Sequence, residues 1–311
     1  MKKKCLIVDR MHESLFPMLK EIGWECDYKP ELSRSEIKNI HHEYTGLIVR
    51  SKTQVDQDLL GDSPTIKFVG RAGAGLDNLD LEYLTRKKIQ VLHAAEGNRD
   101  AVGEYTVGIL LSLLRNISKA DHEVRSFIWN REANRGMEIM DKTIGIIGYG
   151  NMGKAFAKRL SGFGCKVLAY DKYKTGYSDS FGEESNMERI CQDADILSLH
   201  IPLTAETRKM VNHEYLTRFS KNIVLINTSR GEIVSQADLL IMLESGRIMG
   251  AALDVLENEK LNTLTFAERE NLTKLLQQQN VIFTPHIAGW TFESHVKINV
   301  ALKEKIKSLD L

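Results

Sequence analysis

The stretch TIGIIGYGNMGKAFAKRL, residues 143–160, determines the fold of the larger part of this 311-residue chain. A short apolar run comes first, glycines follow at positions 148, 150 and 153, and apolar residues then recur at three- and four-residue steps. That order predicts a buried strand, a tight glycine turn and a helix that extends to Phe163. Glycines that let the backbone approach closely, next to the free N–H groups of a helix start, are typical of a pyrophosphate-binding turn.

Further strand-like runs follow this stretch, and helical patterns separate most of them. They are KVLAY (166–170), DILSLH (195–200), IVLINTS (223–229), MGAALDV (249–255) and NVIFTP (280–285). Continuous apolar strands that alternate with helices indicate a parallel sheet that is covered on both faces. One of the intervening helices is predicted to run from Ser235, a suitable N-cap, to Gly246, which would end it.

The N-terminal third of the chain repeats this alternation on a smaller scale, which predicts a second α/β domain. Its strand-like runs are CLIVD (5–9), GLIVRS (46–51), IKFVGR (66–71) and IQVLH (89–93). A helical stretch at 290–308 is too short to form a domain, so the simplest arrangement returns it to this first domain. We therefore expect a discontinuous domain of residues 1–97 and 287–311, with residues 98–286 inserted as the other domain.

Composition and charge exclude several classes of function. Lys and Arg number 42, as do Asp and Glu, so a nucleic-acid or polybasic membrane partner has no electrostatic support. The longest apolar run, 107–114, is far shorter than the ~20 residues that span a bilayer. The 4 cysteines form no CxxC pair, which gives no indication of a metal site or a disulfide framework and favours a reducing cytoplasm.

An acidic residue at the end of the next strand predicts which dinucleotide binds. In such folds it lies about 20 residues beyond the glycines, and Asp171 directly follows KVLAY. Its carboxylate can accept hydrogen bonds from ribose hydroxyls and would repel a 2′-phosphate, which favours NAD over NADP. Lys172 is the opposing signal, because a cation here would partly tolerate that phosphate. The alternative interpretation is a glycine turn beside a surface aspartate.

Charged residues follow three of the predicted strands: Arg230 in NTSRG, Asp254 and Glu259 in ALDVLENE, and His286 in TPHIAG. The carboxyl ends of parallel strands meet at one edge of a sheet, where such folds bind their ligands. An Arg that binds a carboxylate, a His that exchanges a proton and a carboxylate that orients the His suit the interconversion of a 2-hydroxy acid and a 2-keto acid. Each alone is more typical of a structural residue, but the three together, beyond a cofactor turn, favour catalysis.

These motifs, in this order and over nearly the whole chain, resemble those of the D-2-hydroxyacid dehydrogenase family. The resemblance implies a Rossmann-type doubly wound parallel sheet inserted into a smaller, flavodoxin-like α/β substrate domain. It implies that Arg230 binds the substrate carboxylate, that His286 is the acid and base, and that Glu259 is its hydrogen-bonded partner. Asp254 would hold the nicotinamide carboxamide. The cofactor-binding residues implied in this way are Gly148, Gly150, Asn151, Met152, Gly153, Asp171, Thr228 and Asp254.

The chain departs from the family pattern at three places. Lys260 stands where the family usually has a proline after the glutamate, which removes a rigid φ next to Glu259. The stretch 261–279 is long for this loop, and its apolar spacing predicts a helix. Trp290 replaces a usually smaller residue, so we expect it to narrow the substrate pocket.

Two arginines in the smaller domain indicate an anionic substrate. Arg50 and Arg71 end neighbouring predicted strands, and a guanidinium suits phosphate through its bidentate fork. The glycine-rich loop after Arg71 is expected to turn backbone N–H groups toward a carboxylate, with Ala72, Gly73 and Ala74 as the binding residues. The motifs VRSxTxV (49–55) and GRAGxGxDN (70–78) resemble the phosphoglycerate dehydrogenase branch. The alternative is that both arginines are surface charges.

The favoured reaction is therefore the NAD-dependent conversion of 3-phosphoglycerate to 3-phosphohydroxypyruvate, as in serine biosynthesis. Reduction of glyoxylate or hydroxypyruvate is the second hypothesis, and a corepressor-like NAD(H)-sensing protein of the same fold is the third. That branch often carries a C-terminal regulatory domain, and because the sequence ends soon after Ser308 we expect no serine-binding module. The family resemblance also implies a homodimer.

Overall fold

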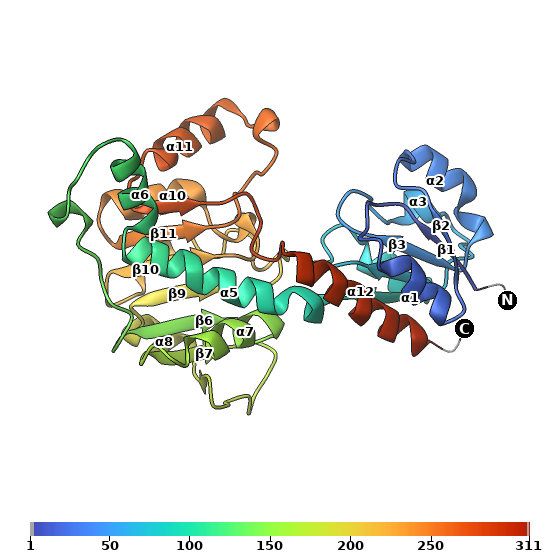
Figure 1. Cartoon of the computed structure of the whole chain (residues 1–311), viewed down its shortest axis with the longest axis horizontal. Coiled ribbons are helices and arrows are strands. Elements are labelled where there is room, and N and C mark those ends of the chain that lie inside the picture. Colours follow the sequence, from blue (N-terminus) through green and yellow to red (C-terminus); the bar gives the residue numbers. More distant parts are fainter. Residues whose placement is uncertain (1–2, 310) are drawn as a thin grey trace. The chain divides into compact units, whose positions relative to one another are not determined.

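The computed structural model describes residues 3–309 and 311. The chain divides into two compact units, one of residues 1–99 with 290–311 and the other of residues 100–289. Each unit is built around one parallel β-sheet with helices packed against it (Figure 1). The expected fold class, a doubly wound parallel sheet together with a smaller α/β part, is confirmed.

The larger unit holds a seven-stranded parallel sheet in the order β12-β11-β10-β9-β6-β7-β8. Its strands are β6 (Thr143–Ile147), β7 (Lys166–Tyr170), β8 (Glu183–Glu184), β9 (Ile196–Leu199), β10 (Ile223–Asn227), β11 (Ile248–Leu253) and β12 (Val281–Phe283). The strand order reverses between β6 and β9, which pair in parallel. A crevice at the carboxyl ends of the strands on either side of such a reversal is where doubly wound sheets bind dinucleotides.

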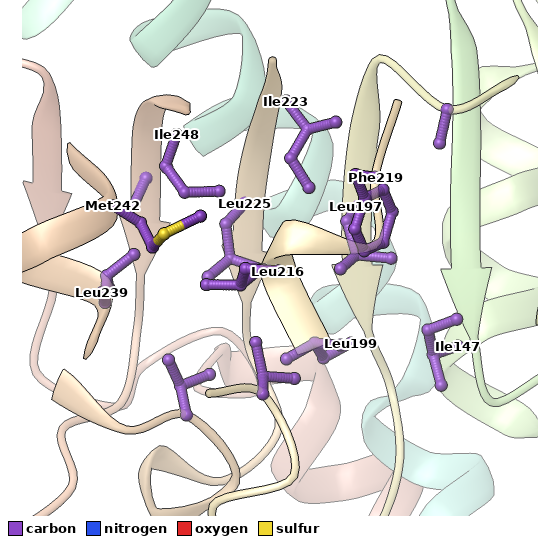
Figure 2. Packing of buried hydrophobic residues seen from close by; sticks show 14 of the residues in the cluster. Ile147, Leu197, Leu199, Leu216, Phe219, Ile223, Leu225, Leu239, Met242 and Ile248 are labelled. Atoms are coloured by element: carbon purple, nitrogen blue, oxygen red, sulfur yellow. The ribbon is translucent and has the colours of Figure 1, made fainter. Parts of the chain in front are cut away.

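Helices cover both faces of this sheet because their apolar residues recur with helical spacing. The helices of this unit are α6 (Ile117–Arg125), which buries no residue, α7 (Asn151–Leu160), α8 (Met187–Asp193), α9 (His213–Thr217), α10 (Gln236–Glu244) and α11 (Phe266–Leu276), and α5 (Ala95–Leu114) begins in the smaller unit. Figure 2 shows the core on one face, where Leu225 and Leu197 from the strands pack with Phe219 and Met242. The N-cap predicted at Ser235 is confirmed, since its side chain accepts a hydrogen bond from the backbone N–H of Asp238.

The smaller unit has a five-stranded parallel sheet in the order β2-β1-β3-β4-β5, which is flavodoxin-like. Its strands are β1 (Lys4–Ile7), β2 (Glu25–Tyr28), β3 (Gly46–Val49), β4 (Phe68–Arg71) and β5 (Gln90–His93). Its helices are α1 (Leu15–Glu21), α2 (Arg34–Ile40), α3 (Gln57–Leu60), α4 (Leu81–Arg86) and α12 (Phe292–Lys307). Ile298, Leu302 and Ile306 of α12 complete the core on one face of the sheet.

The structure refines the interpretation of two stretches of the sequence. The apolar run 107–114 lies within the long helix α5, which is separated from α6 where Asn116 takes a left-handed φ of 54°. The helix expected within 261–279 is present as α11, and a capping box at Thr265 and Glu268 starts it.

None of the helices in the described part of the chain combines the length and the apolar character needed to cross a membrane. Residues 3–309 and 311 also contain no group of three or more His, Cys, Asp or Glu side chains that could hold a metal ion.

Candidate active site

The glycine turn between β6 and α7 is shaped by close contacts that only glycine allows. Gly148 has a φ of +93°, and a Cβ there would lie 2.4 Å from the carbonyl oxygen of His200. A Cβ on Gly153 would lie 2.1 Å from the carbonyl oxygen of Gly148. At Gly150 the nearest atom to such a Cβ is the Nζ of Lys174, 3.9 Å away, so the backbone is open on that side.

This turn fits the pyrophosphate of a dinucleotide. Gly150 is the N-cap of α7, and Asn151 and Met152 begin the first turn, whose N–H groups have no partner within the helix. The helix start therefore combines free donors, a favourable dipole and an open approach at Gly150. These residues would hold the phosphates when the cofactor is bound.

Asp171 lies at the end of β7 and is held against the glycine turn. Its side chain is 11% exposed and accepts hydrogen bonds from the backbone N–H of Tyr149 at 3.0 Å and of Tyr173 at 3.1 Å. A carboxylate has about four acceptor positions, so it retains capacity for ribose hydroxyls.

The cation beside Asp171 is Lys174, whereas the sequence pointed to Lys172. The Nζ of Lys174 lies 3.6 Å from Asp171 Oδ2 and donates to the carbonyl oxygen of Tyr149 at 3.1 Å. Lys172 instead pairs with Glu206. Position along the chain does not reveal which of two nearby lysines a turn directs toward the carboxylate.

His286 and Glu259 meet beyond the carboxyl end of the same sheet. The Nδ1 of His286 lies 2.9 Å and 3.1 Å from the two carboxylate oxygens of Glu259. Both side chains are about half exposed, at 44% and 47%. Because Glu259 engages Nδ1, Nε2 is the ring nitrogen that can exchange a proton with a substrate.

The loop that carries His286 is anchored by Asp254. This carboxylate is fully buried and accepts hydrogen bonds from Thr284 Oγ1 at 2.7 Å, Ile287 N at 2.9 Å and Ala288 N at 2.8 Å. His286 itself takes a left-handed φ of 57°, and its backbone N–H donates to the Asp254 carbonyl oxygen at 2.7 Å. Sequence reasoning missed this anchoring role, and the implied contact of Asp254 with the nicotinamide stays a prediction.

Glu257, the carboxylate two residues before Glu259, is engaged elsewhere. It accepts from the backbone N–H of Gln236 at 3.0 Å and pairs with Lys209 at 2.7 Å. This contact with the first residue of α10 fixes the segment before Glu259 to the helix. The structure therefore pairs His286 with Glu259 and gives Glu257 a bracing position.

Arg230 lies in the turn between β10 and α10, which packs closely on the segment leading to Glu259. Asn227 donates from Nδ2 to the Arg230 carbonyl oxygen at 2.9 Å, and Arg230 Nη1 donates to the Ser229 carbonyl oxygen at 2.6 Å. A Cβ on Gly231 would lie 1.8 Å from the carbonyl oxygen of Leu256. Thr228, at the start of this turn, is buried with its hydroxyl 3.3 Å from that of Thr106.

The two arginines of the smaller unit lie in different surroundings. The Arg50 guanidinium lies 4.2 Å from the centre of the Trp290 ring. Arg71 folds over its own loop, where its Nη1 occupies the space next to Gly73, which has a φ of +148°. In the register of β3 and β4, Val49 and not Arg50 is the residue opposite Arg71. A small pocket beside this sheet is lined by Arg50 and Ala72, and Arg71 is not among its lining residues.

The glycine-rich loop uses part of its donor capacity internally. The N–H of Ala72 donates to the Val49 carbonyl oxygen and that of Gly73 to the Arg71 carbonyl oxygen, both at 2.9 Å. The expected contact of Ala72, Gly73 and Ala74 with a carboxylate stays a prediction.

A glycine turn at the start of a helix, an acidic end of the next strand and an all-parallel doubly wound sheet define a dinucleotide-binding protein. Residues 107–288 match the family described as "D-isomer specific 2-hydroxyacid dehydrogenase, NAD binding domain". The chain belongs to the D-isomer specific 2-hydroxyacid dehydrogenase family, and its larger unit is the NAD-binding domain.

Relatives and solved structures agree with this assignment. A D-3-phosphoglycerate dehydrogenase from Methanocaldococcus jannaschii is 34% identical over 98% of this chain, which spans 57% of the length of that relative. A hydroxypyruvate reductase from Thermotoga maritima is 34% identical over 88% of each chain. The D-lactate dehydrogenase of Aquifex aeolicus, solved with NAD and lactic acid, aligns with a TM-score of 0.82 and 25% identity over 98% of this chain and 94% of that chain.

Proposed function

We propose that the protein is an NAD-dependent enzyme that interconverts a D-2-hydroxy acid and a 2-keto acid. The observation that carries the proposal is the His286–Glu259 pair, beyond the carboxyl end of the sheet that also carries the glycine turn. During oxidation the substrate hydroxyl gives its proton to His286 Nε2, while Glu259 holds the ring through Nδ1. NAD accepts the hydride when it is bound.

The other proposed roles follow from position and charge. Arg230 would bind the substrate carboxylate through its guanidinium. Cofactor binding is assigned to the glycine turn, Asp171, Thr228 and Asp254, with Asp171 favouring NAD over NADP. The cytoplasm is the proposed location, which fits four cysteines that are all free thiols.

The proposed substrate is 3-phosphoglycerate, which would be oxidised to 3-phosphohydroxypyruvate as a step of serine biosynthesis. The partly buried guanidinium of Arg50 supports an anionic substrate, and the relative from M. jannaschii bears that enzyme's name. Glyoxylate or hydroxypyruvate reduction is the second candidate, supported by the T. maritima relative. A corepressor-like NAD(H)-binding protein without turnover is the third.

One assay separates these candidates. The purified protein is mixed with NAD and, in turn, 3-phosphoglycerate, D-glycerate, glycolate and D-lactate, and NADH is followed by absorbance; the reverse reaction is followed with the keto acids. We expect the highest kcat/KM with 3-phosphoglycerate. Preference for glyoxylate or hydroxypyruvate would replace the first candidate with the second, and NADH binding without turnover of any acid would favour the third.

The variants Arg50→Ala and Arg71→Ala test which arginine binds the phosphate group of the substrate. Loss of a charge-assisted pair should raise the KM for 3-phosphoglycerate more than the KM for D-glycerate. The difference between the two effects should correspond to ~2 kcal/mol of apparent binding free energy. Equal effects on both substrates would indicate general damage to the unit.

We further propose a homodimer formed through the larger unit. The segment between α6 and β6 projects from that unit (Figure 1), and on it Phe127 and Trp129 are 100% and 80% exposed. An apolar surface of this kind marks a protein contact site. Light scattering should give the mass of a dimer for the native chain and of a monomer for a Phe127→Asp, Trp129→Asp variant.

A further inference from the structure

Two cysteines face each other in the smaller unit. Cys5 of β1 and Cys26 of β2 are directly opposite in the parallel register of these strands, so their side chains leave the same face of the sheet. Their Sγ atoms lie 3.1 Å apart, within hydrogen-bond distance for sulfur. The two residues are 21 positions apart in the chain, which is why a search for CxxC spacing does not find them.

The backbone of this pair already suits a disulfide bond. Neighbouring strands lie about 4.8 Å apart, and the Cα atoms of a cystine are usually about 4.4–6.8 Å apart. Because Cys5 and Cys26 are direct partners in adjacent strands, an S–S bond can join them with little movement of β1 and β2.

The two thiols differ in access. Cys5 is 1% exposed, whereas Cys26 is half-buried on β2, the strand at one edge of the sheet (Figure 1). Space around Cys5 is tight, because a Cβ on Gly46 would lie 3.2 Å from the Cβ of Cys5 and 2.3 Å from the ring of Phe68. Trp24 packs edge to face on that ring at 5.1 Å. A reagent can therefore reach Cys26, while the packing around Cys5 excludes a bulky adduct.

Hydrogen bonding makes Cys26 the more reactive of the two thiols. Cys26 donates to the Trp24 carbonyl oxygen at 3.9 Å, so the thiol of Cys5 is the donor between the two sulfurs. This hydrogen bond, together with burial, raises the pKa of Cys5. It lowers the pKa of Cys26, against the opposing effects of burial and of the charges of Asp27 and Glu25. Cys26 therefore ionises first, and a thiolate is the form of cysteine that attacks.

We propose that Cys5 and Cys26 form a reversible oxidation site that reacts with a low-molecular-weight disulfide such as oxidised glutathione. The Cys26 thiolate attacks one sulfur of the reagent, which forms a mixed disulfide and releases a first thiolate. Cys5 then loses its proton and attacks the Sγ of Cys26, which forms the Cys5–Cys26 bond and releases a second thiolate. Two protein thiols are thus oxidised, and the reagent is reduced to two thiols that take up the two protons. This inference goes beyond the proposed function and does not rest on it.

The bond has a physical consequence for the smaller unit. It closes a loop of residues 5–26 that contains α1, whose Leu15 and Leu19 share a core with Cys5. A closed loop reduces the conformational freedom of the unfolded chain, so oxidation stabilises this unit. Disulfides in a reducing cytoplasm are usually transient, which suits a site that responds to oxidising conditions.

Peptide mapping of the full chain tests the bond directly. The reduced protein is incubated with oxidised glutathione, alkylated and digested with trypsin, and the peptides are identified by mass spectrometry. We expect residues 5–10 and 21–34 to be recovered as one linked peptide, which dithiothreitol separates. The peptides 160–166 and 190–208, which carry Cys165 and Cys191, should be recovered with alkylated thiols.

Variants separate the roles of the two cysteines. In Cys5→Ser, and in Cys5→Ala as a second variant, Cys26 should retain glutathione as a stable adduct because no second thiol releases it. In Cys26→Ser neither the linked peptide nor an adduct on Cys5 should form. Cys165→Ser is the matched control, since Cys165 is partly buried like Cys26, and it should leave the linked peptide unchanged. The circular dichroism spectrum of each variant confirms that it is folded.

Urea unfolding measures the effect of the bond on stability. Oxidation should raise the urea midpoint of the native chain by about 1 M and leave the midpoint of Cys26→Ser unchanged. Three results would overturn the proposal: peptides 5–10 and 21–34 that stay separate after oxidation, a Cys26→Ser variant in which Cys5 is still oxidised, or a linked peptide found only in dimers on a non-reducing gel.

Discussion

Lys260 shows how a single residue can replace a proline without loosening its loop. Its backbone N–H donates to Asn258 Oδ1 at 2.9 Å, a bond that a proline could not make. Its carbonyl oxygen accepts from the backbone and hydroxyl of Thr263, both at 2.8 Å. These hydrogen bonds restrain the backbone next to Glu259. They take the place of the fixed φ that a proline at position 260 would give.

Glu259→Gln should lower kcat by roughly ten- to a hundredfold, because a neutral amide no longer stabilises the charged ring that forms when His286 takes a proton. The Kd for NADH, measured by fluorescence, should not change. Glu257→Gln is the matched control, since Glu257 contacts Gln236 and Lys209. An equal loss of kcat in that variant would show that His286 is oriented by another carboxylate.

Lys174→Ala should increase the preference for NADH over NADPH. The variant removes the cation 3.6 Å from Asp171, and with it both a partner for a 2′-phosphate and partial neutralisation of the carboxylate. We expect the ratio of the two Kd values to change by about fivefold, near the upper end for an exposed ion pair. Lys172→Ala should leave the ratio unchanged. A larger effect of Lys172→Ala than of Lys174→Ala would show that Lys172, as the sequence indicated, is the lysine that influences the choice of cofactor.

At the scale of elements, two of the three glycines in α5 have opposite environments. A Cβ on Gly103 would lie 2.7 Å from the carbonyl oxygen of Ala155 in α7, whereas a Cβ on Gly108 would meet no atom within 4 Å. Gly103 therefore lets two helices approach closely, while Gly108 only adds backbone freedom to a helix.

The same substitution should thus have opposite effects within one helix. Gly103→Ala is expected to lower the free energy of unfolding by about 1–3 kcal/mol through overpacking, and Gly108→Ala to raise it by about 0.5–1 kcal/mol. Urea unfolding followed by circular dichroism measures both. Destabilisation by Gly108→Ala would mean that its side of the helix is covered, for example by a second copy of the chain.

The helices and strands could be predicted from the sequence, because the period of apolar residues and the spacing of glycines are local properties of the chain. The strands around the glycine turn, the cap at Ser235 and α11 could all be predicted from such patterns. The register between β3 and β4 could not, because it depends on contacts between distant segments, and it places Val49, not Arg50, beside Arg71. The anchoring of the His286 loop by Asp254 was hidden for the same reason.

At the scale of the whole molecule, buried histidines make stability depend on pH. Burial lowers the pKa of His41, His93 and His295, and lowers that of His200 to about 3. The unfolded chain takes up these protons near pH ~6.5, before the folded chain does. Stability should therefore be constant with respect to these groups above that pH and should fall as the pH drops below it.

His200→Gln tests this dependence, because glutamine can replace the contact of His200 Nε2 with Ser198 Oγ at 2.8 Å. Urea midpoints at pH 8, 6.5 and 5 should fall less steeply below pH 6.5 in the variant than in the native chain. His122→Gln, at an exposed position on α6, is the control. Identical slopes for all three proteins would show that His200 does not titrate differently in the folded and unfolded chains.

Helix α12 has a consequence for the order in which the molecule is assembled during translation. Its residues Ile298, Leu302 and Ile306 cover Ile48 and Phe68 in the smaller unit, yet the ribosome makes the whole of 100–289 first. The larger unit can therefore close its core while one face of the earlier sheet still lacks its cover. During synthesis the middle of the chain can therefore complete its fold before the smaller unit does. Until α12 is made, the uncovered apolar face of the smaller sheet is the surface that a chaperone would bind.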